Sequence, residues 1–210
     1  MNYRISKRLV CVLFVLVALM PFATLRIELA SPSSEAVATV ASPSLESEPA
    51  TNRTLRVSSI SELQSRINSA LPGDQIIVVN GVYSTAGSIK VAKQGIAARP
   101  IVISAETIGS VEINGTAGFD LESPASYVVI KGFKFTHSIG TVQVRAGASH
   151  CRLTRNVFEL KGEERYLIVS GDDCEIDHNT FQNKSTVGPM FSIHGPGTSG
   201  MAQRTWVSFS

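Results

Sequence analysis

The sequence predicts an all-β protein, a right-handed parallel β-helix with coils of about 23 residues and a helical cap at its amino-terminal end. The main observation is a repeat. Three eight-residue segments superpose without gaps, each starting 23 residues after the one before: 128–135, 151–158 and 174–181. In each, the first, third and eighth residues are apolar, as in a short strand that is followed by a turn and another inward side chain. This period fits one coil of a β-helix, and the leucine ladder of leucine-rich repeats is absent.

Stacked coils place equivalent residues above one another. We therefore expect Phe135, Phe158 and Phe181 to form an internal aromatic stack, and Asn156 to form a hydrogen-bonded ladder with Asn179. The residues predicted to point inward in columns are Val128, Ile130, Phe135, Leu153, Phe158, Ile176 and Phe181.

Two cysteines occupy one of these columns. Cys151 lies one period before Cys174, which raises the alternatives of a disulfide and two buried thiols. Neighbouring parallel strands lie about 4.8 Å apart with side chains that point the same way. A disulfide needs Cβ atoms at roughly 3.8 Å with converging bonds. We therefore expect two buried thiols.

The body is predicted to open with an amphipathic helix that covers the end of the solenoid. Ser61 is the predicted N-cap, with Gln64 three residues later, and 72–73 is a Pro-Gly stop. Leu63, Ile67 and Leu71 form the predicted apolar face. Four short strands punctuated by glycines follow, at 75–79, 88–91, 100–104 and 111–113.

Residues 1–54, before the predicted domain, are interpreted as a leader and a linker. Residues 1–30 combine Arg4, Lys7 and Arg8 with an apolar run at 9–20, which predicts a cleaved signal peptide. An uncleaved membrane anchor is the alternative, because residues 9–25 carry no charge. Either reading makes the protein secreted or extracytoplasmic. Residues 31–54 are rich in Ser, Ala, Pro, Glu and Thr and predict a disordered linker, so the domain spans 55–210.

The charge balance excludes some partners. The net charge is +2, and only 17% of the residues are charged. No basic helix and no cluster of basic and aromatic residues is present, so the sequence predicts no nucleic-acid binding. It also predicts no membrane contact beyond the possible anchor.

Several motifs resemble one family. In order, these are Pro-Gly-Asp at 72–74, Val-Asn-Gly-Val-Tyr at 79–83 and Arg-Pro-Ile-Val-Ile at 99–103. The most specific is Cys-Glu-Ile-Asp-His-Asn-Thr-Phe at 174–181 with Lys184 after it. This order is similar to the polysaccharide lyase family that contains alginate lyases and chondroitinase B, a pectate-lyase-like β-helix. The resemblance runs from Val57 to about Val207.

The resemblance implies β-elimination on a uronic-acid polysaccharide of the alginate or dermatan/chondroitin type. In that family a Lys acts as base beside an Arg, and Asn and Glu residues hold calcium, which is expected in the full-length enzyme. The matching coils would lie beyond residue 210, so we expect an incomplete carboxyl-terminal end and no activity of this chain alone. No catalytic or metal-binding residue is assigned. The alternatives are a non-catalytic polysaccharide-binding or adhesin-like module, and a complete pectate-lyase-like enzyme that uses loop acids.

A few residues remain candidates for an anionic polysaccharide partner. Lys161 and Lys184 share a column after their phenylalanines, and stacked cations along one edge suit a polyanion, so both are predicted to bind substrate. The paired acids at 163–164 and 172–173 are read as solvated loop charge. His178 follows Asp177 and is expected to form a structural hydrogen bond at the turn.

Overall fold

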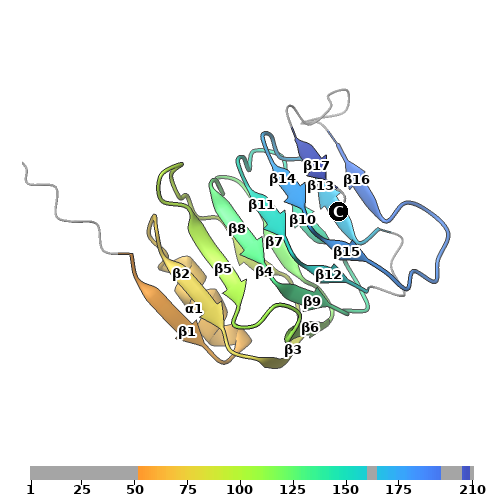
Figure 1. The fold of residues 1–210 in the computed structure, drawn as a ribbon, viewed down its shortest axis with the longest axis horizontal. Coiled ribbons are helices and arrows are strands. Elements are labelled where there is room, and N and C mark those ends of the chain that lie inside the picture. Colours follow the sequence, from red (N-terminus) through yellow and green to blue (C-terminus); the bar gives the residue numbers. More distant parts are fainter. Residues whose placement is uncertain (1–51, 160–164, 195–204, 209–210) are drawn as a thin grey trace, which may run out of the picture. The chain divides into compact units, whose positions relative to one another are not determined.

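The computed structural model describes residues 52–159, 165–194 and 205–208, which form one helix and a series of short strands (Figure 1). Within these ranges, no helix is long and apolar enough to cross a membrane. The elements are β1 (Thr54–Val57), α1 (Ile60–Asn68), β2 (Gln75–Val78), β3 (Gly81–Thr85), β4 (Ile89–Val91), β5 (Ile101–Ala105), β6 (Val111–Gly115), β7 (Phe119–Leu121), β8 (Val128–Lys131), β9 (Phe133–Phe135), β10 (Val142–Val144), β11 (Arg152–Thr154), β12 (Val157–Phe158), β13 (Leu167–Val169), β14 (Glu175–Asp177), β15 (Thr180–Phe181), β16 (Phe191–Ile193) and β17 (Trp206–Ser208).

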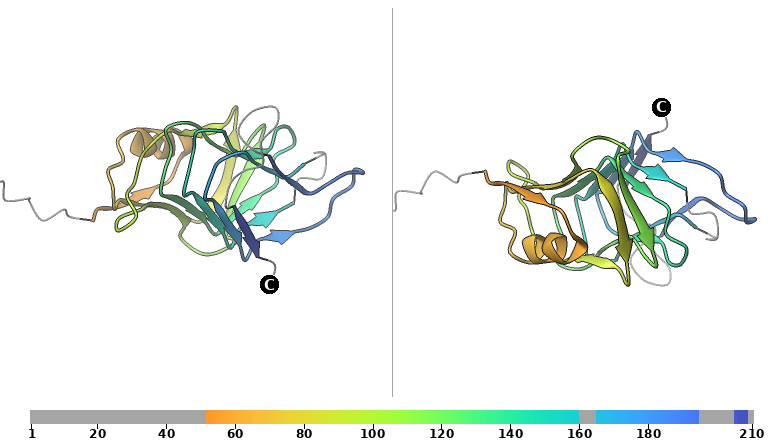
Figure 2. Two further views of the ribbon diagram at one scale, coloured as in Figure 1. Left: turned by 90° about the horizontal axis from the view of Figure 1, so that it is seen from above. Right: turned by 90° about the horizontal axis from the view of Figure 1, so that it is seen from below.

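The strands form three parallel sheets. Sheet A has the order β1-β2-β5-β8-β11-β14-β17, sheet B the order β3-β6-β9-β12-β15, and sheet C the order β4-β7-β10-β13-β16. Each coil therefore contributes one strand to each sheet, and the chain returns to the same sheet at every third strand from β2 onward. Successive coils lie side by side in all three views (Figures 1 and 2). The predicted parallel β-helix is confirmed.

The register of sheet A confirms the repeat. Leu153 of β11 pairs with Ile130 of β8 on one side and with Ile176 of β14 on the other, at the predicted 23-residue offset. Of the residues predicted to point inward, all but Phe181 are buried, and Phe181 packs against the core while remaining partly exposed. The side-chain alternation of each short strand is therefore enough to specify which face meets the core.

Both predicted ladders are present in the core. The Phe158 ring stacks 5.0 Å from that of Phe135 and 4.8 Å from that of Phe181, measured between centroids. Fully buried Asn156 donates from its side-chain amide to Asn179 Oδ1 at 3.1 Å, and its own Oδ1 accepts from the backbone of Phe133 at 3.0 Å. These contacts satisfy polar groups that the turn would otherwise bury unpaired.

Cys151 and Cys174 are free and buried, as predicted. Each thiol lies within hydrogen-bonding distance of a carbonyl two residues earlier, Ser149 O at 3.3 Å and Asp172 O at 3.4 Å. The contact with Cys174 and burial both raise the pKa of the Cys151 thiol, so this sulfur is held in its protonated, unreactive form.

The helix begins earlier than predicted. Ser59, not Ser61, is the N-cap: its backbone is extended and its side chain accepts from the Glu62 amide at 3.2 Å. The Glu62 carboxylate accepts from the amide of Ser58, the residue before the N-cap, at 3.2 Å, so the pair resembles a capping box two residues upstream of the predicted one. The expected apolar face is also shorter, because Leu71 lies beyond the helix and is 56% exposed.

The predicted linker ends too late. β1 begins at Thr54 and pairs with β2, so the last residue assigned to the linker already belongs to sheet A. Arg53 also bonds to buried Asp74 through Nε at 2.9 Å, which anchors the chain before the first strand. The rest of the predicted leader and linker, up to residue 51, lies outside the described residues.

The turns between the strands also repeat from coil to coil, because the same positions adopt a left-handed backbone conformation. The residues just before β8, β11 and β14, namely Tyr127, His150 and Asp173, all adopt the left-handed conformation with φ between 50° and 53°. A second left-handed column, Arg155 and His178, follows β11 and β14. Because one left-handed residue reverses the direction of the backbone locally, a fixed position for it gives each coil the same path.

Candidate functional site

The Asp-His motif of the 174–184 coil is held on the outer face of sheet A. Asp177 ends β14, and its carboxylate accepts two hydrogen bonds from Arg152, from Nε at 2.9 Å and from Nη2 at 2.8 Å. It accepts a third from Thr154 Oγ1 at 3.0 Å. Both donors lie on β11, one coil earlier, and they leave the Asp177 side chain only 4% exposed.

His178 occupies the corner that follows. Its φ of 54° turns the ring back toward the strand, and Nδ1 lies 2.5 Å from Asp177 Oδ2. The predicted structural hydrogen bond at this turn is therefore confirmed. The imidazole itself is 53% exposed, so a carboxylate that binds Nδ1 leaves Nε2 as the ring nitrogen available to a ligand.

The electrostatics of the cluster follow from the Arg152–Asp177 pair. The hydrogen bonds from Arg152 hold the pKa of Asp177 well below its usual range, with smaller contributions from His178 and Thr154, although burial opposes them. The same pair raises the pKa of Arg152. Both groups are therefore ionised over the whole physiological range, and their charges largely cancel. The cluster is suited to orienting the imidazole rather than to transferring a proton from Asp177.

Lys184 lies on a different part of the coil. Its Nζ donates to Thr186 Oγ1 at 2.6 Å and sits 5.7 Å from the centroid of the Tyr166 ring. Lys184 follows β15, whereas His178 precedes it, so the strand separates the two predicted groups. Lys161, the other lysine predicted to bind substrate, lies outside the described residues, as do the acids at 163–164.

The acids at 172–173 belong to the left-handed corner before sheet A. Asp173 Oδ2 lies 3.8 Å from His150 Nε2, and the His150 ring stacks on Tyr127 with 4.4 Å between centroids. Among the residues that the structure describes, no group of three or more His, Cys, Asp or Glu side chains is arranged to hold a metal ion.

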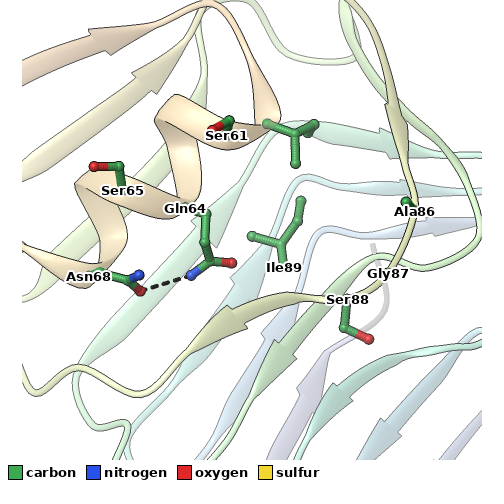
Figure 3. A pocket seen from close by; sticks show the side chains of 9 residues that line it. Ser61, Gln64, Ser65, Asn68, Ala86, Gly87, Ser88 and Ile89 are labelled. Carbon is green, nitrogen blue, oxygen red and sulfur yellow. Dashed lines mark hydrogen bonds between the residues drawn. The ribbon is translucent and has the colours of Figure 1, made fainter.

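A pocket of about 540 Å³ lies between α1 and the turn from β3 to β4 (Figure 3). Its polar lining consists of serine hydroxyls and side-chain amides, with no titratable group: Ser61, Gln64, Ser65, Asn68 and Ser88. The Gln64 amide both donates to Lys90 O and accepts from Lys90 N, at 2.9 Å each. This helix residue thus pairs with the outermost strand of sheet C, and the pocket is part of the cap.

The sequence contained a signal for the partners of Asp177 that the motif alone does not reveal. Thr154 lies 23 residues before Asp177, and Arg152 lies two residues earlier still, on the same face of β11. Following the repeat through polar as well as apolar columns would have brought these three residues together.

Comparison with known proteins extends the picture. The sequence model of the chondroitinase B family matches residues 57–203. No curated protein matches the chain.

Solved structures show the same fold. The PL6 family alginate lyase AlyGC aligns with a TM-score of 0.58 and 23% identity over 66% of this chain and 20% of its own. A mannuronic acid specific family 6 lyase from human gut microbiota gives 0.57 and 24% over 66% of this chain and 36% of its own. A PL6 family polysaccharide lyase from Pseudopedobacter saltans gives 0.55 and 18% over 73% and 36%. The chain thus spans between a fifth and about a third of the length of these lyases.

Proposed function

Because the chain belongs to the chondroitinase B family of polysaccharide lyases, we propose that it acts on a uronic-acid polysaccharide, with β-elimination as the reaction of the complete active site. The observation that carries the proposal is the family match over 57–203, which includes every coil from β2 to β16 in the described part of the chain. The Asp-His corner and the lysine after it lie on the last of these coils.

The reaction defines what a site must contain. Removing the C5 proton of a uronate requires a partner that neutralises the carboxylate, a base near C5, and a proton source for the leaving oxygen. In this family calcium would supply the neutralising charge. Among the described residues no group of three or more His, Cys, Asp or Glu side chains is arranged to hold a metal ion, and no step is assigned to a metal here. These coils are proposed to bind and orient the polymer.

Lys184 is the proposed contact for a uronate carboxylate. Its Nζ is placed by Thr186 Oγ1 and by the Tyr166 ring, which limits the rotamers of this half-buried side chain. Binding of the ground state through one cation does not by itself lower the barrier to elimination. We therefore expect the 210-residue chain to bind such polymers weakly without cleaving them.

The experiment combines binding and turnover. The purified chain is titrated with alginate, dermatan sulfate and a neutral glucan at several salt concentrations, and the ultraviolet absorbance of unsaturated uronate is followed with calcium present. We expect weak binding of the two polyanions that falls as salt rises, and no unsaturated product. Lys184→Ala should weaken binding, whereas the matched control Lys93→Ala on the turn after β4 should not.

The possible results separate the parts of the proposal. Equal binding of the neutral glucan, or no binding of either uronate polymer, would overturn the substrate class. Measurable turnover by the 210-residue chain would show instead that catalytic groups lie among residues assigned here as structural. Residues 1–30 are proposed to direct export, which amino-terminal sequencing of protein recovered from the medium would test.

A further inference from the structure

A groove lies on the outer face of sheet C, whereas the Asp-His corner lies on sheet A. It has a volume of about 490 Å³ and crosses three successive coils at β10, β13 and β16. A volume in this range accommodates a small ligand such as a sugar unit. Its principal lining side chains are Gln143, Arg145, Ile168, Ser170 and His194.

Arg145 is the only fully charged side chain among the groove residues, and an ion pair with the preceding coil holds it in place. Its Nε and Nη2 each donate to a carboxylate oxygen of Asp120 at 2.7 Å. Asp120 lies one coil earlier on β7, and its side chain is only 5% exposed, whereas that of Arg145 is 52% exposed. The planar guanidinium is therefore fixed in orientation, and its Nη1 amino group makes no hydrogen bond within the described part of the chain.

The other side chains supply what a sugar ring needs beside a charge. Gln143 donates to Thr141 Oγ1 at 2.8 Å, which orients its amide and leaves the carbonyl oxygen as an acceptor. The Ser170 hydroxyl can donate or accept. Ile168, between them on β13, offers an apolar surface for the C–H face of a ring.

Among the described residues, the acidic side chains near the groove lie only at its β7 end. The acids on this face, Asp120 and Glu122, lie on or just after β7 and have their own basic partners, Arg145 and Lys90. The groove residues on β13, just after β13 and just after β16 are Ile168, Ser170 and His194, and none of them is an acid. A carboxylate that approaches Arg145 from the β13 side therefore meets no like charge.

We propose that this groove binds one hexuronate unit, with the carboxylate at Arg145 Nη1, hydroxyls at Gln143 and Ser170, and the ring over Ile168. The inference rests on the proposed uronate specificity and adds a contact surface on sheet C, whereas the Asp-His corner lies on sheet A. Two separate contacts would let one polymer engage the solenoid at both places at once, which raises avidity without new catalytic groups.

The test uses a short uronate oligosaccharide, an alginate-derived trisaccharide, with isothermal titration calorimetry on the full chain. Ile168→Glu places a carboxylate in the centre of the groove and should weaken binding at least about tenfold. The double variant Asp120→Asn/Arg145→Gln removes both charges while keeping amide groups at both positions, and it should have the same effect. Circular dichroism melts establish that both variants are folded.

Matched variants distinguish this inference from the proposal on which it rests. Lys93→Ala, on the turn after β4, should leave binding of the trisaccharide within about twofold of the parent, and an uncharged maltotriose should not bind in the groove. If Ile168→Glu and the double variant bind the trisaccharide as the parent does while Lys184→Ala does not, the groove is overturned and the uronate specificity stands. If the parent binds maltotriose as well as the uronate, the role of Arg145 is refuted. If the parent binds no uronate oligomer or polymer, both proposals fall.

Discussion

Replacing His137 by leucine should change how the stability of the fold depends on pH. His137 lies between β9 and β10, is 1% exposed, and packs its ring edge-on against Phe135 with 6.1 Å between centroids. A Cβ at position 118 would lie 2.8 Å from His137 Nε2, so Gly118 is what makes room for the ring. Neither ring nitrogen has a well-formed hydrogen bond. Burial lowers the pKa of His137 to about 4, and the nearby Ile139 backbone offsets only a small part of this effect.

The size and sign of the effect follow from that pKa. An unfolded histidine titrates near 6.5, and each pKa unit is worth about 1.4 kcal/mol, so the difference amounts to roughly 3 kcal/mol. Between these two pKa values the unfolded chain binds a proton that the folded chain does not. The free energy of unfolding should therefore fall by roughly 3 kcal/mol as the pH drops from about 6.5 to about 4. Below that range both states are protonated and this contribution levels off.

The assay is urea denaturation followed by circular dichroism at a series of pH values. The difference in the free energy of unfolding between the parent and His137→Leu should change by roughly 3 kcal/mol between about pH 6.5 and about pH 4. The change in packing adds a constant offset that does not depend on pH. Ile130→Val serves as the control, because it changes the packing of a buried core residue without removing a titratable group and should leave the slope of the parent unchanged. Parallel curves for the parent and His137→Leu would refute the assignment of a buried, neutral imidazole.

Three further predictions test the core and the Asp-His cluster. Asn156→Ala leaves a buried backbone N–H of β9 unpaired and should cost about 1–3 kcal/mol in the urea midpoint analysis; an unchanged midpoint would contradict the ladder. Phe158→Ala should cost about 3–5 kcal/mol and Phe181→Ala clearly less, because only the first ring is fully buried; equal losses of stability would contradict this ranking. The depressed pKa of Asp177 stabilises the fold above the ordinary aspartate pKa, and this contribution is lost as the pH falls toward the folded value, so Arg152→Gln should show a shallower decline of Tm on acidification than the parent.

The repeat explains why so much of the core could be predicted from the sequence. In a parallel β-helix each residue lies above its equivalent one coil earlier, so a constant offset converts sequence columns directly into spatial columns. The 23-residue period therefore predicts the stack of Phe135, Phe158 and Phe181 and the pairing of Asn156 with Asn179 without any further information. It also predicts that Cys151 and Cys174 are neighbours whose side chains point the same way and remain thiols.

The family motifs could also be recognised from the sequence, because each is a continuous stretch of chain. The Asp-His corner, the lysine that follows it and the order of the short segments before it are continuous stretches of chain, and they indicated the family that the sequence model then matched over 57–203. The helix was located correctly, but its N-cap was misplaced because two nearby serines satisfy the same pattern. The extended backbone of Ser59 and the hydrogen bond that its side chain accepts from the Glu62 amide identify it as the N-cap.

Apart from β4, which matches the strand predicted at 88–91, the strands of sheet C could not be predicted from the sequence, nor could the polar contacts between coils. β7, β10, β13 and β16 have three residues each, too few for an alternation pattern to be distinguished from a loop. Arg145 reaches Asp120, and Arg152 reaches Asp177, across 25 positions rather than 23, because long side chains lean diagonally to a neighbouring column. A period specifies where backbones stack, whereas the direction in which a long charged side chain bends depends on which partner is buried beside it. The groove on sheet C, and the separation of Lys184 from His178 by β15, were therefore decided by the tertiary structure alone.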